Sequence, residues 1–218
     1  MKKNLIACRT IENELNKVLE KRKEAFEIRW LEAGLHDVPQ KLNARLQQEI
    51  DACTGCDAAL LLMGTCGNSI VGIKSNDIQL VIPRVDDCIS FLMGSQSKRK
   101  NHKNTYFMTE GWLKGERNIM REYEYCVQKY GAETGNNIFG MMFRNYEYLA
   151  LLDTGAFDTE KAQEETLQIC DALKFKYKKI DGTLSYIEEM LDEKWSSERY
   201  IIIPPGHTVT MEDCRLNY

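Results

Sequence analysis

The 218-residue chain has no long hydrophobic run and no strong excess of either charge. No apolar segment approaches the roughly 18 to 20 residues that a helix needs to cross a bilayer, so we expect no membrane span. The first fifteen residues carry two lysines but too short an apolar stretch for a signal peptide, which predicts a cytoplasmic protein. The formal net charge of −4 gives no reason to expect nucleic acid as a partner.

Repeats and low-complexity segments are also missing, and 43% apolar with 28% charged residues is typical of a globular protein. The one basic cluster, residues 97–103 (SKRKNHK), is interpreted as a solvated loop. Cysteine, in contrast, occurs eight times. Because cytoplasmic thiols stay reduced, we interpret these cysteines as core residues, metal ligands or nucleophiles rather than as disulfides.

Short apolar runs alternate with longer amphipathic segments along the chain. The predicted strands are 4–7, 26–31, 58–63, 79–85, 105–109, 148–152, 177–180 and 200–203. The predicted helices are 10–23, 39–50, 87–93, 116–130, 136–148, 158–174 and 184–195. This alternation predicts an α/β fold with parallel sheets covered by helices on both faces. We expect two Rossmann-like lobes, residues 1–112 and, with a helical connection, residues 113–218.

Four potential metal ligands occupy equivalent positions in successive strand–helix units. Cys8, His36 and Cys66 follow the first three predicted strands, and Cys88 lies in the first turn after the fourth. Parallel sheets bind ligands outside the carboxyl ends of their strands, so these side chains are expected at one edge. The pattern predicts a metal site, in which His36 is either a ligand or a supporting group.

The C-x-x-C of Cys53 and Cys56 precedes the third predicted strand and is therefore expected at the opposite edge of the sheet. Cys126 and Cys170 lie among apolar residues at helical spacing and are predicted to be core residues. The C-x-x-C is therefore predicted to lie outside the site.

Several residues near the cysteines are suited to binding a small anionic ligand. Gly67 and Asn68 follow Cys66 and allow close backbone approach. Arg84 either binds a carboxylate or phosphate, or forms an ion pair with Asp87 at a helix cap. Trp112, in a Gly-Trp turn, is the last predicted ligand-binding residue.

The segments LLLMGTCGNSIVGI, LVIPRVDDCISFLMGS and TYFMTEGW, with ACRTIENEL and LHDVPQKL, resemble domain-of-unknown-function family 1638 over nearly the whole chain. The resemblance implies a protein of anaerobes, often encoded beside corrinoid proteins and their methyltransferases. The family residue before the Asp-Cys pair is often histidine, where this chain has Asp86. The implied motif positions are Cys8, His36, Cys66, Gly67, Pro83, Arg84, Asp87, Cys88, Gly94 and Trp112.

Three functions follow as hypotheses, and whether the protein is an enzyme stays open. In the first, Cys8, Cys66 and Cys88 hold an iron–sulfur cluster, favoured slightly over zinc with His36. This metalloprotein transfers electrons or methyl groups in corrinoid-dependent methyl-group or one-carbon metabolism. In the second, a metal-free cysteine enzyme uses Cys66 as nucleophile, His36 as base and Asp87 to orient it. The third is a non-catalytic accessory module that binds a corrinoid protein or methyltransferase.

Overall fold

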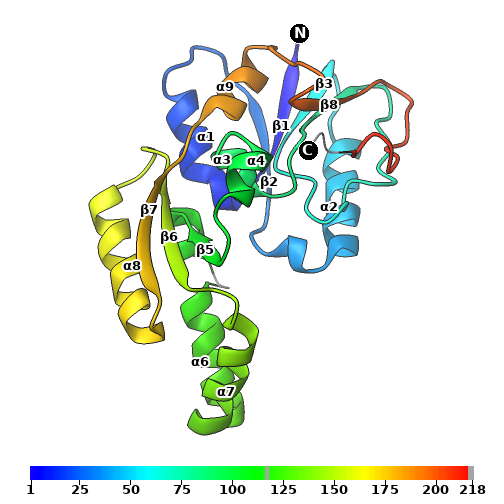
Figure 1. Ribbon diagram of the computed structural model, residues 1–218. Helices are drawn as coiled ribbons and strands as arrows, with labels where there is room; N and C mark the ends of the chain where they lie inside the picture. The colour runs from blue at the N-terminus through cyan, green and yellow to red at the C-terminus, as the bar shows by residue number, and fades with distance from the viewer. Residues whose placement is uncertain (116–117, 216–218) are drawn as a thin grey trace. The chain divides into compact units, whose positions relative to one another are not determined.

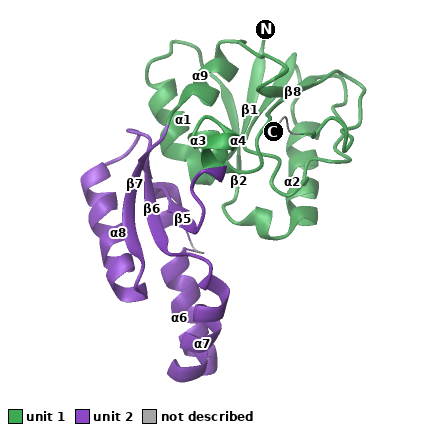
Figure 2. Ribbon diagram, in the orientation of Figure 1, with its two compact units in different colours: residues 1–99, 183–218 green, residues 100–182 purple. Residues whose placement is uncertain are grey.

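The computed structural model describes residues 1–115 and 118–215, which divide into two compact units (Figures 1 and 2). Unit 1 combines residues 1–99 with residues 183–218, and unit 2 consists of residues 100–182. This division differs from the expected single boundary after residue 112. The chain leaves unit 1 after Arg99 and returns to it at Thr183.

Unit 1 contains a five-stranded sheet in the order β2-β1-β3-β4-β8. Its parallel strands are β1 (Lys3–Cys8), β2 (Glu27–Leu31), β3 (Ala58–Leu62) and β4 (Gln79–Pro83). The last strand, β8 (Tyr200–Ile203), runs antiparallel to β4, with Leu80 opposite Ile203. Because it follows the other strands in sequence, this strand was expected in the second lobe. An apolar run predicts that a strand forms, but it predicts neither the strand's partner nor its direction.

Helices cover both faces of this sheet. Figure 1 shows α1 (Glu12–Leu19) and α9 (Ser185–Leu191) on one face and α2 (Pro39–Asp51) on the other. Helix α2 buries Leu42, Leu46 and Ile50 in a core that contains Ile6 and Leu61. The shorter helical segments are η1 (Arg9–Ile11), η2 (Leu35–Asp37), α3 (Cys88–Leu92) and α4 (Gln96–Lys100). The basic cluster expected to be a loop thus partly forms α4.

Unit 2 is built on a parallel three-stranded sheet, ordered β5 (Thr105–Met108), β6 (Tyr148–Asp153) and β7 (Lys176–Asp181). Its helices are α5 (Glu110–Leu113), α6 (Ile119–Tyr130), α7 (Ala132–Phe143) and α8 (Thr159–Leu173). Residues 116 and 117 of the helix expected from 116 lie outside the described residues. Both units confirm the predicted α/β class with mostly parallel sheets.

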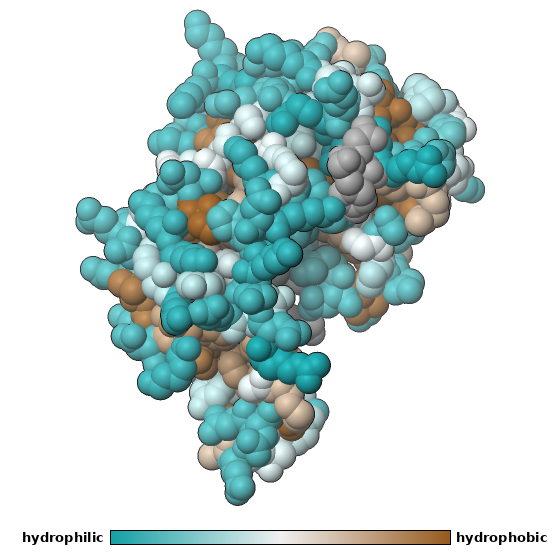
Figure 3. Space-filling view, in the orientation of Figure 1, coloured by the Kyte–Doolittle hydropathy of each residue, from teal (hydrophilic) through white to brown (hydrophobic). Residues whose placement is uncertain are grey.

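Helix α7 begins four residues earlier than expected because glycines shape its junction with α6. Gly131 has φ 82°, which ends α6, and α7 starts at the next residue. A Cβ atom at Gly135 would lie 2.7 Å from the Cys126 carbonyl oxygen, so the two helices cross closely. In the described part of the chain, no helix is both long enough and apolar enough for a membrane crossing. The face seen in Figure 3 is mostly hydrophilic.

Candidate functional site

The strand order of unit 1 creates a switch point between β1 and β3. From β1 the chain goes to β2 on one side, and then crosses back to place β3 on the other side. In open α/β sheets, a crevice forms at the carboxyl ends of two such strands and is the usual ligand site. Cys8 is the last residue of β1, and Cys66 follows β3 by four residues.

A pocket lies at this point and is formed entirely by unit 1. Cys8, His36, Cys66 and Cys88 all contribute to it, so the convergence expected from their spacing is present. The cavity volume is about 30 Å³, enough for one or two water-sized groups. The lining residues are Cys8, Thr10, Leu31, Glu32, Leu35, His36, Leu42, Met63, Cys66 and Cys88.

The loop that carries Cys66 has an unusual backbone. Cys66, Gly67 and Asn68 have φ values of 46°, 68° and 62°, three successive residues in the left-handed region. This region costs an L-residue roughly 1–2 kcal/mol, and such strain tends to occur at functional sites. The backbone amide of Cys66 donates to the Asp86 carbonyl oxygen at 2.7 Å, and that of Thr65 donates to Val85 at 2.8 Å. The loops after β3 and β4 are therefore held together.

The Asp86–Asp87–Cys88 segment is fixed by its own hydrogen bonds. Asp87 is the N-cap of α3, and its Oδ1 accepts a hydrogen bond from the Ser90 amide at 2.7 Å. Gln96 receives a hydrogen bond from the Asp86 amide at 2.9 Å and donates to its Oδ2 at 2.6 Å. These contacts place Cys88 at the start of α3 and hold both carboxylates beside the Cys66 loop.

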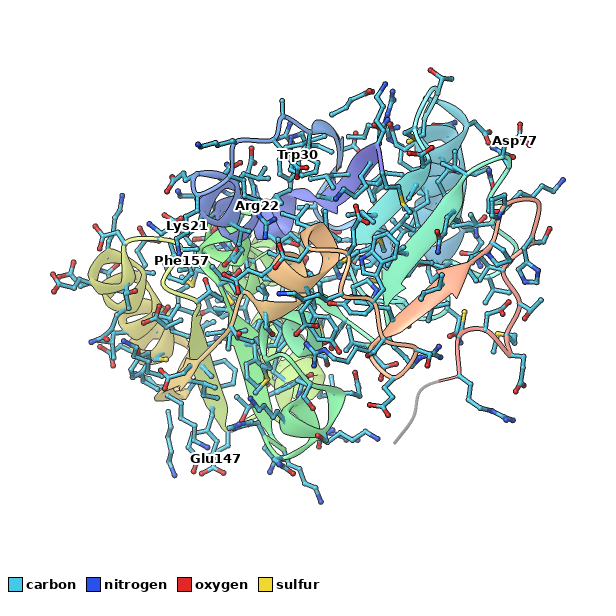
Figure 4. All side chains as sticks on the ribbon, turned by 90° about the horizontal axis from the view of Figure 1, so that it is seen from above. Lys21, Arg22, Trp30, Asp77, Glu147 and Phe157 are labelled. Atoms are coloured by element: carbon cyan, nitrogen blue, oxygen red, sulfur yellow. The ribbon has the colours of Figure 1, made fainter. Side chains whose placement is uncertain are left out.

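The electrostatic environment of the pocket is unfavourable for anions. Burial, with smaller contributions from the neighbouring Cys8 and Asp87, raises the pKa of the Cys66 thiol to about 12. The Thr10 hydroxyl donates to Cys8 Sγ at 3.1 Å. No lysine or arginine is among the described residues that line the pocket. Arg9, near in sequence, pairs with Glu12 and lies 5.2 Å from the ring of Trp30, which Figure 4 labels.

Arg84, which was predicted to bind a ligand, lies outside the pocket and contacts backbone carbonyl groups instead. The Arg84 guanidinium donates to the carbonyl oxygens of Ser197, Asp213, Arg215 and Tyr200, at 2.6 to 3.3 Å. It therefore holds β8 and the C-terminal segment, which corrects the expectation of an anion-binding or Asp87-paired arginine. Backbone carbonyl oxygens compete with carboxylates and phosphates for a guanidinium, and the sequence does not show which carbonyls will lie near it.

Neither Gly67, Asn68 nor Asp87 is among the lining residues. Asp87 caps α3, and the backbone of Gly67 and Asn68 shapes the Cys66 loop. Trp112 lies in α5 of unit 2 and packs against that unit's hydrophobic core. These four residues and Arg84 are therefore outside the described lining of this pocket.

The C-x-x-C lies at the opposite end of the strands. Cys56 directly precedes Asp57, whose amide donates to the Lys2 carbonyl oxygen at the beginning of β1. The buried Cys53 donates through Sγ to the Glu49 carbonyl oxygen at 3.2 Å. Burial raises the pKa of both thiols. The remaining cysteines, Cys126, Cys170 and Cys214, are buried.

Sequence reasoning missed two polar residues of the pocket, Thr10 and Glu32. Both lie close behind the ends of parallel strands, Thr10 after β1 and Glu32 immediately after β2. The same rule that selected the cysteines could have found them, if it had been applied to oxygen donors as well. His36 Nε2 lies 3.5 Å from Asp37 Oδ1 in η2.

The described residues contain no group of three or more His, Cys, Asp or Glu side chains arranged closely enough to hold a metal ion. Rotation about the Cα–Cβ bond moves a cysteine sulfur by about 3 Å, so thiols lining one small pocket can approach a common point. The donor chemistry fits a soft metal, since three cysteines are among the described residues that line the pocket and no lysine or arginine is. Coordination itself stays a prediction.

No curated protein and no solved structure matches this chain. The family model described as "Protein of unknown function (DUF1638)" matches residues 30–191, which cover Glu32, His36, Cys66 and Cys88 of the pocket. Because this match spans well over half of the chain, the protein belongs to that family, as its sequence segments indicated.

Proposed function

We propose that the protein is a metalloprotein that binds a soft metal ion through the thiolates of Cys8, Cys66 and Cys88. The observation that carries the proposal is the pocket at the β1/β3 switch point, which these residues line together with His36. Together with His36 they come from four successive loops, 22 to 30 residues apart, whereas the adjacent pair Cys53 and Cys56 lies elsewhere. If these cysteines were only small apolar core residues, nothing would favour their gathering at one pocket from separate loops.

The size of the pocket supports a single ion more than a cluster. A volume of about 30 Å³ suits one ion with one small ligand. A four-iron cluster is larger, so the side chains that line the pocket would have to move apart to hold it. Zinc held by three thiolates with one exchangeable position fits this space. The iron–sulfur cluster remains the other form of the proposal, and analysis of iron and sulfide distinguishes the two.

The charges around the pocket support a cation as its ligand. Burial, and then repulsion from Cys8 and from the carboxylates of Asp87 and Asp86, raises the pKa of the Cys66 thiol and disfavours a bare thiolate there. A divalent ion offsets this repulsion, and the protons of the ligating thiols pass to solvent when it binds. A bound ion with an open position supplies Lewis acidity to a small ligand.

The same features disfavour the metal-free enzyme with Cys66 as nucleophile. A catalytic cysteine needs a lowered pKa, usually from a nearby cation or a helix N-terminus. Here burial raises the pKa of Cys66 to about 12, and its own amide is bonded to Asp86. That enzyme would also leave Cys8 and Cys88 without a role.

A role in corrinoid-dependent methyl-group or one-carbon metabolism is part of the proposal, with a corrinoid protein or methyltransferase as partner. It rests on the family resemblance. Binding between the metal-loaded protein and a purified corrinoid protein, measured by calorimetry, is the test. If no binding occurs, this role is wrong, and the metal site is tested separately.

The test of the metal site uses anaerobic purification followed by zinc, iron and sulfide analysis. We expect about one metal ion per chain in the wild type and in the Cys53→Ser/Cys56→Ser double variant, and loss of metal in Cys66→Ser. The double variant is the matched control because it also removes thiols from unit 1. Metal retained in Cys66→Ser would overturn the proposal. So would a metal-free wild type whose Cys66 reacts rapidly with iodoacetamide at pH 8.

A further inference from the structure

We infer that helix α7 of unit 2 binds the same helix of a second copy of this chain, side by side and antiparallel. Helices α6 and α7 pack chiefly against each other, and Figure 1 shows the pair extending beyond the sheet of unit 2. One face of α7 is buried, since Gly135 lies against α6 and the Phe139 ring lies 5.2 Å from that of Tyr123. The opposite face of α7 is exposed.

A stripe of four exposed residues runs along this opposite face. Its members are separated by four, three and four positions, which is the spacing of one helix face. They are Glu133, Asn137, Gly140 and Arg144. Glu133 is in the first turn of α7 and Arg144 is its C-cap residue. The stripe therefore has a negative charge at one end and a positive charge at the other.

The stripe is complementary to itself when two copies of α7 run antiparallel. In the register that places Glu133 opposite Arg144 of the second copy, Asn137 is opposite Gly140 of that copy. A two-fold axis repeats both pairs, so opposite charges meet at each end of the interface. A parallel pair would instead bring the two glutamates together and the two arginines together. The charges thus favour the antiparallel arrangement of two identical helices.

The middle of the stripe allows close packing of apolar groups. A Cβ at Gly140 would meet nothing of its own chain within 4 Å, so a second helix can approach the backbone there. Met141, beside the stripe, is 64% exposed and has the flexible side chain that adapts to a partner surface. The exposed Tyr125 and Tyr130 of α6 are already covered, because Lys129 Nζ lies 5.1 Å from the centre of each ring.

The length of α7 sets the expected strength of the dimer. Its 12 residues extend about 18 Å, so one pair of such helices buries less surface than a standard stable interface. We expect a reversible dimer with a Kd on the order of 10 to 100 µM. Sedimentation velocity of the full chain from about 2 to 500 µM measures it. A reducing buffer with a chelator ensures that neither disulfides nor metal ions link the copies.

Charge reversals test the register. Glu133→Arg should weaken the dimer at least about tenfold, and so should Arg144→Glu, because each variant places like charges opposite each other at both ends. The double variant Glu133→Arg/Arg144→Glu restores opposite charges and should return the Kd to within about threefold of the wild type. The matched control is Glu124→Arg, the same charge change at an exposed position of α6, and it should leave the Kd unchanged.

A second variant, Met141→Asp, tests the apolar part of the interface and should also weaken the dimer. Circular dichroism at low concentration checks that every variant keeps its helices. A wild type that stays monomeric over the whole concentration range overturns the inference and leaves the stripe to a different protein. A dimer that neither the charge reversals nor Met141→Asp weakens also overturns it. So does a weakened dimer that the double reversal fails to restore.

Discussion

At the residue scale, Gly64 has the most constrained position near the pocket. A Cβ atom there would lie 2.6 Å from the Asp87 backbone nitrogen and 2.8 Å from the Asp87 Cα. These are backbone atoms of the loop that carries Cys88, so they cannot move aside like a flexible side chain. Glycine thus lets the loops after β3 and β4 come close enough for Cys66 and Cys88 to share a pocket.

We expect Gly64→Ala to lower the free energy of unfolding by about 1–3 kcal/mol, because overpacking forces the two loops apart. Urea denaturation followed by circular dichroism measures this change. The control is Gly140→Ala, since a Cβ at this helical position meets nothing within 4 Å. It should be neutral or stabilising by up to about 1 kcal/mol. Equal stability of Gly64→Ala and the wild type would contradict the close approach.

At the element scale, Arg84 ties the end of β4 to the C-terminal segment. Besides its four side-chain hydrogen bonds, its amide donates to the Arg199 carbonyl oxygen at 2.7 Å. The segment it holds includes Cys214, which is only 5% exposed. A charged guanidinium that satisfies several backbone carbonyls stabilises more than a neutral donor would.

Arg84→Met should therefore destabilise unit 1 by about 1.5–3 kcal/mol and expose Cys214 to alkylation in the native state. Alkylation followed by peptide mass spectrometry detects the exposed thiol, and Arg144→Met, at an exposed position, is the control. Metal content should not change, because Arg84 is outside the pocket lining. A Cys214 that stays protected in Arg84→Met would show that other contacts hold this segment.

The elements also show what the sequence can and cannot reveal. The strands that end near Cys8, Glu32 and Cys66 are predictable because buried parallel strands are continuous apolar runs at regular spacing. The direction of β8 and the hydrogen-bond partners of Arg84 are not predictable from the sequence, because both depend on backbone groups that every residue carries. The left-handed Cys66 is equally hidden, because no residue type other than glycine signals a positive φ reliably.

At the scale of the whole molecule, unit 1 is discontinuous in sequence and unit 2 is inserted within it. The return point lies beside α3, where the Thr183 amide donates to the Leu92 carbonyl oxygen at 2.7 Å. A Cβ at Gly94 would lie 2.7 Å from Thr183 Cγ2, so this junction is tightly packed. Every residue that lines the pocket belongs to unit 1. Unit 1 should thus contain the complete site.

Replacing residues 100–182 by a Gly-Ser linker of about six residues, which spans roughly 13 Å, should leave a folded unit 1. We expect cooperative urea unfolding, protection of Cys53 and Cys214 from alkylation, and the same metal content per chain as the full protein. A chimera with Cys66→Ser is the control and should lose the metal. If the chimera folds cooperatively but binds no metal, unit 2 contributes to the site, and the assignment of the pocket to unit 1 alone is wrong.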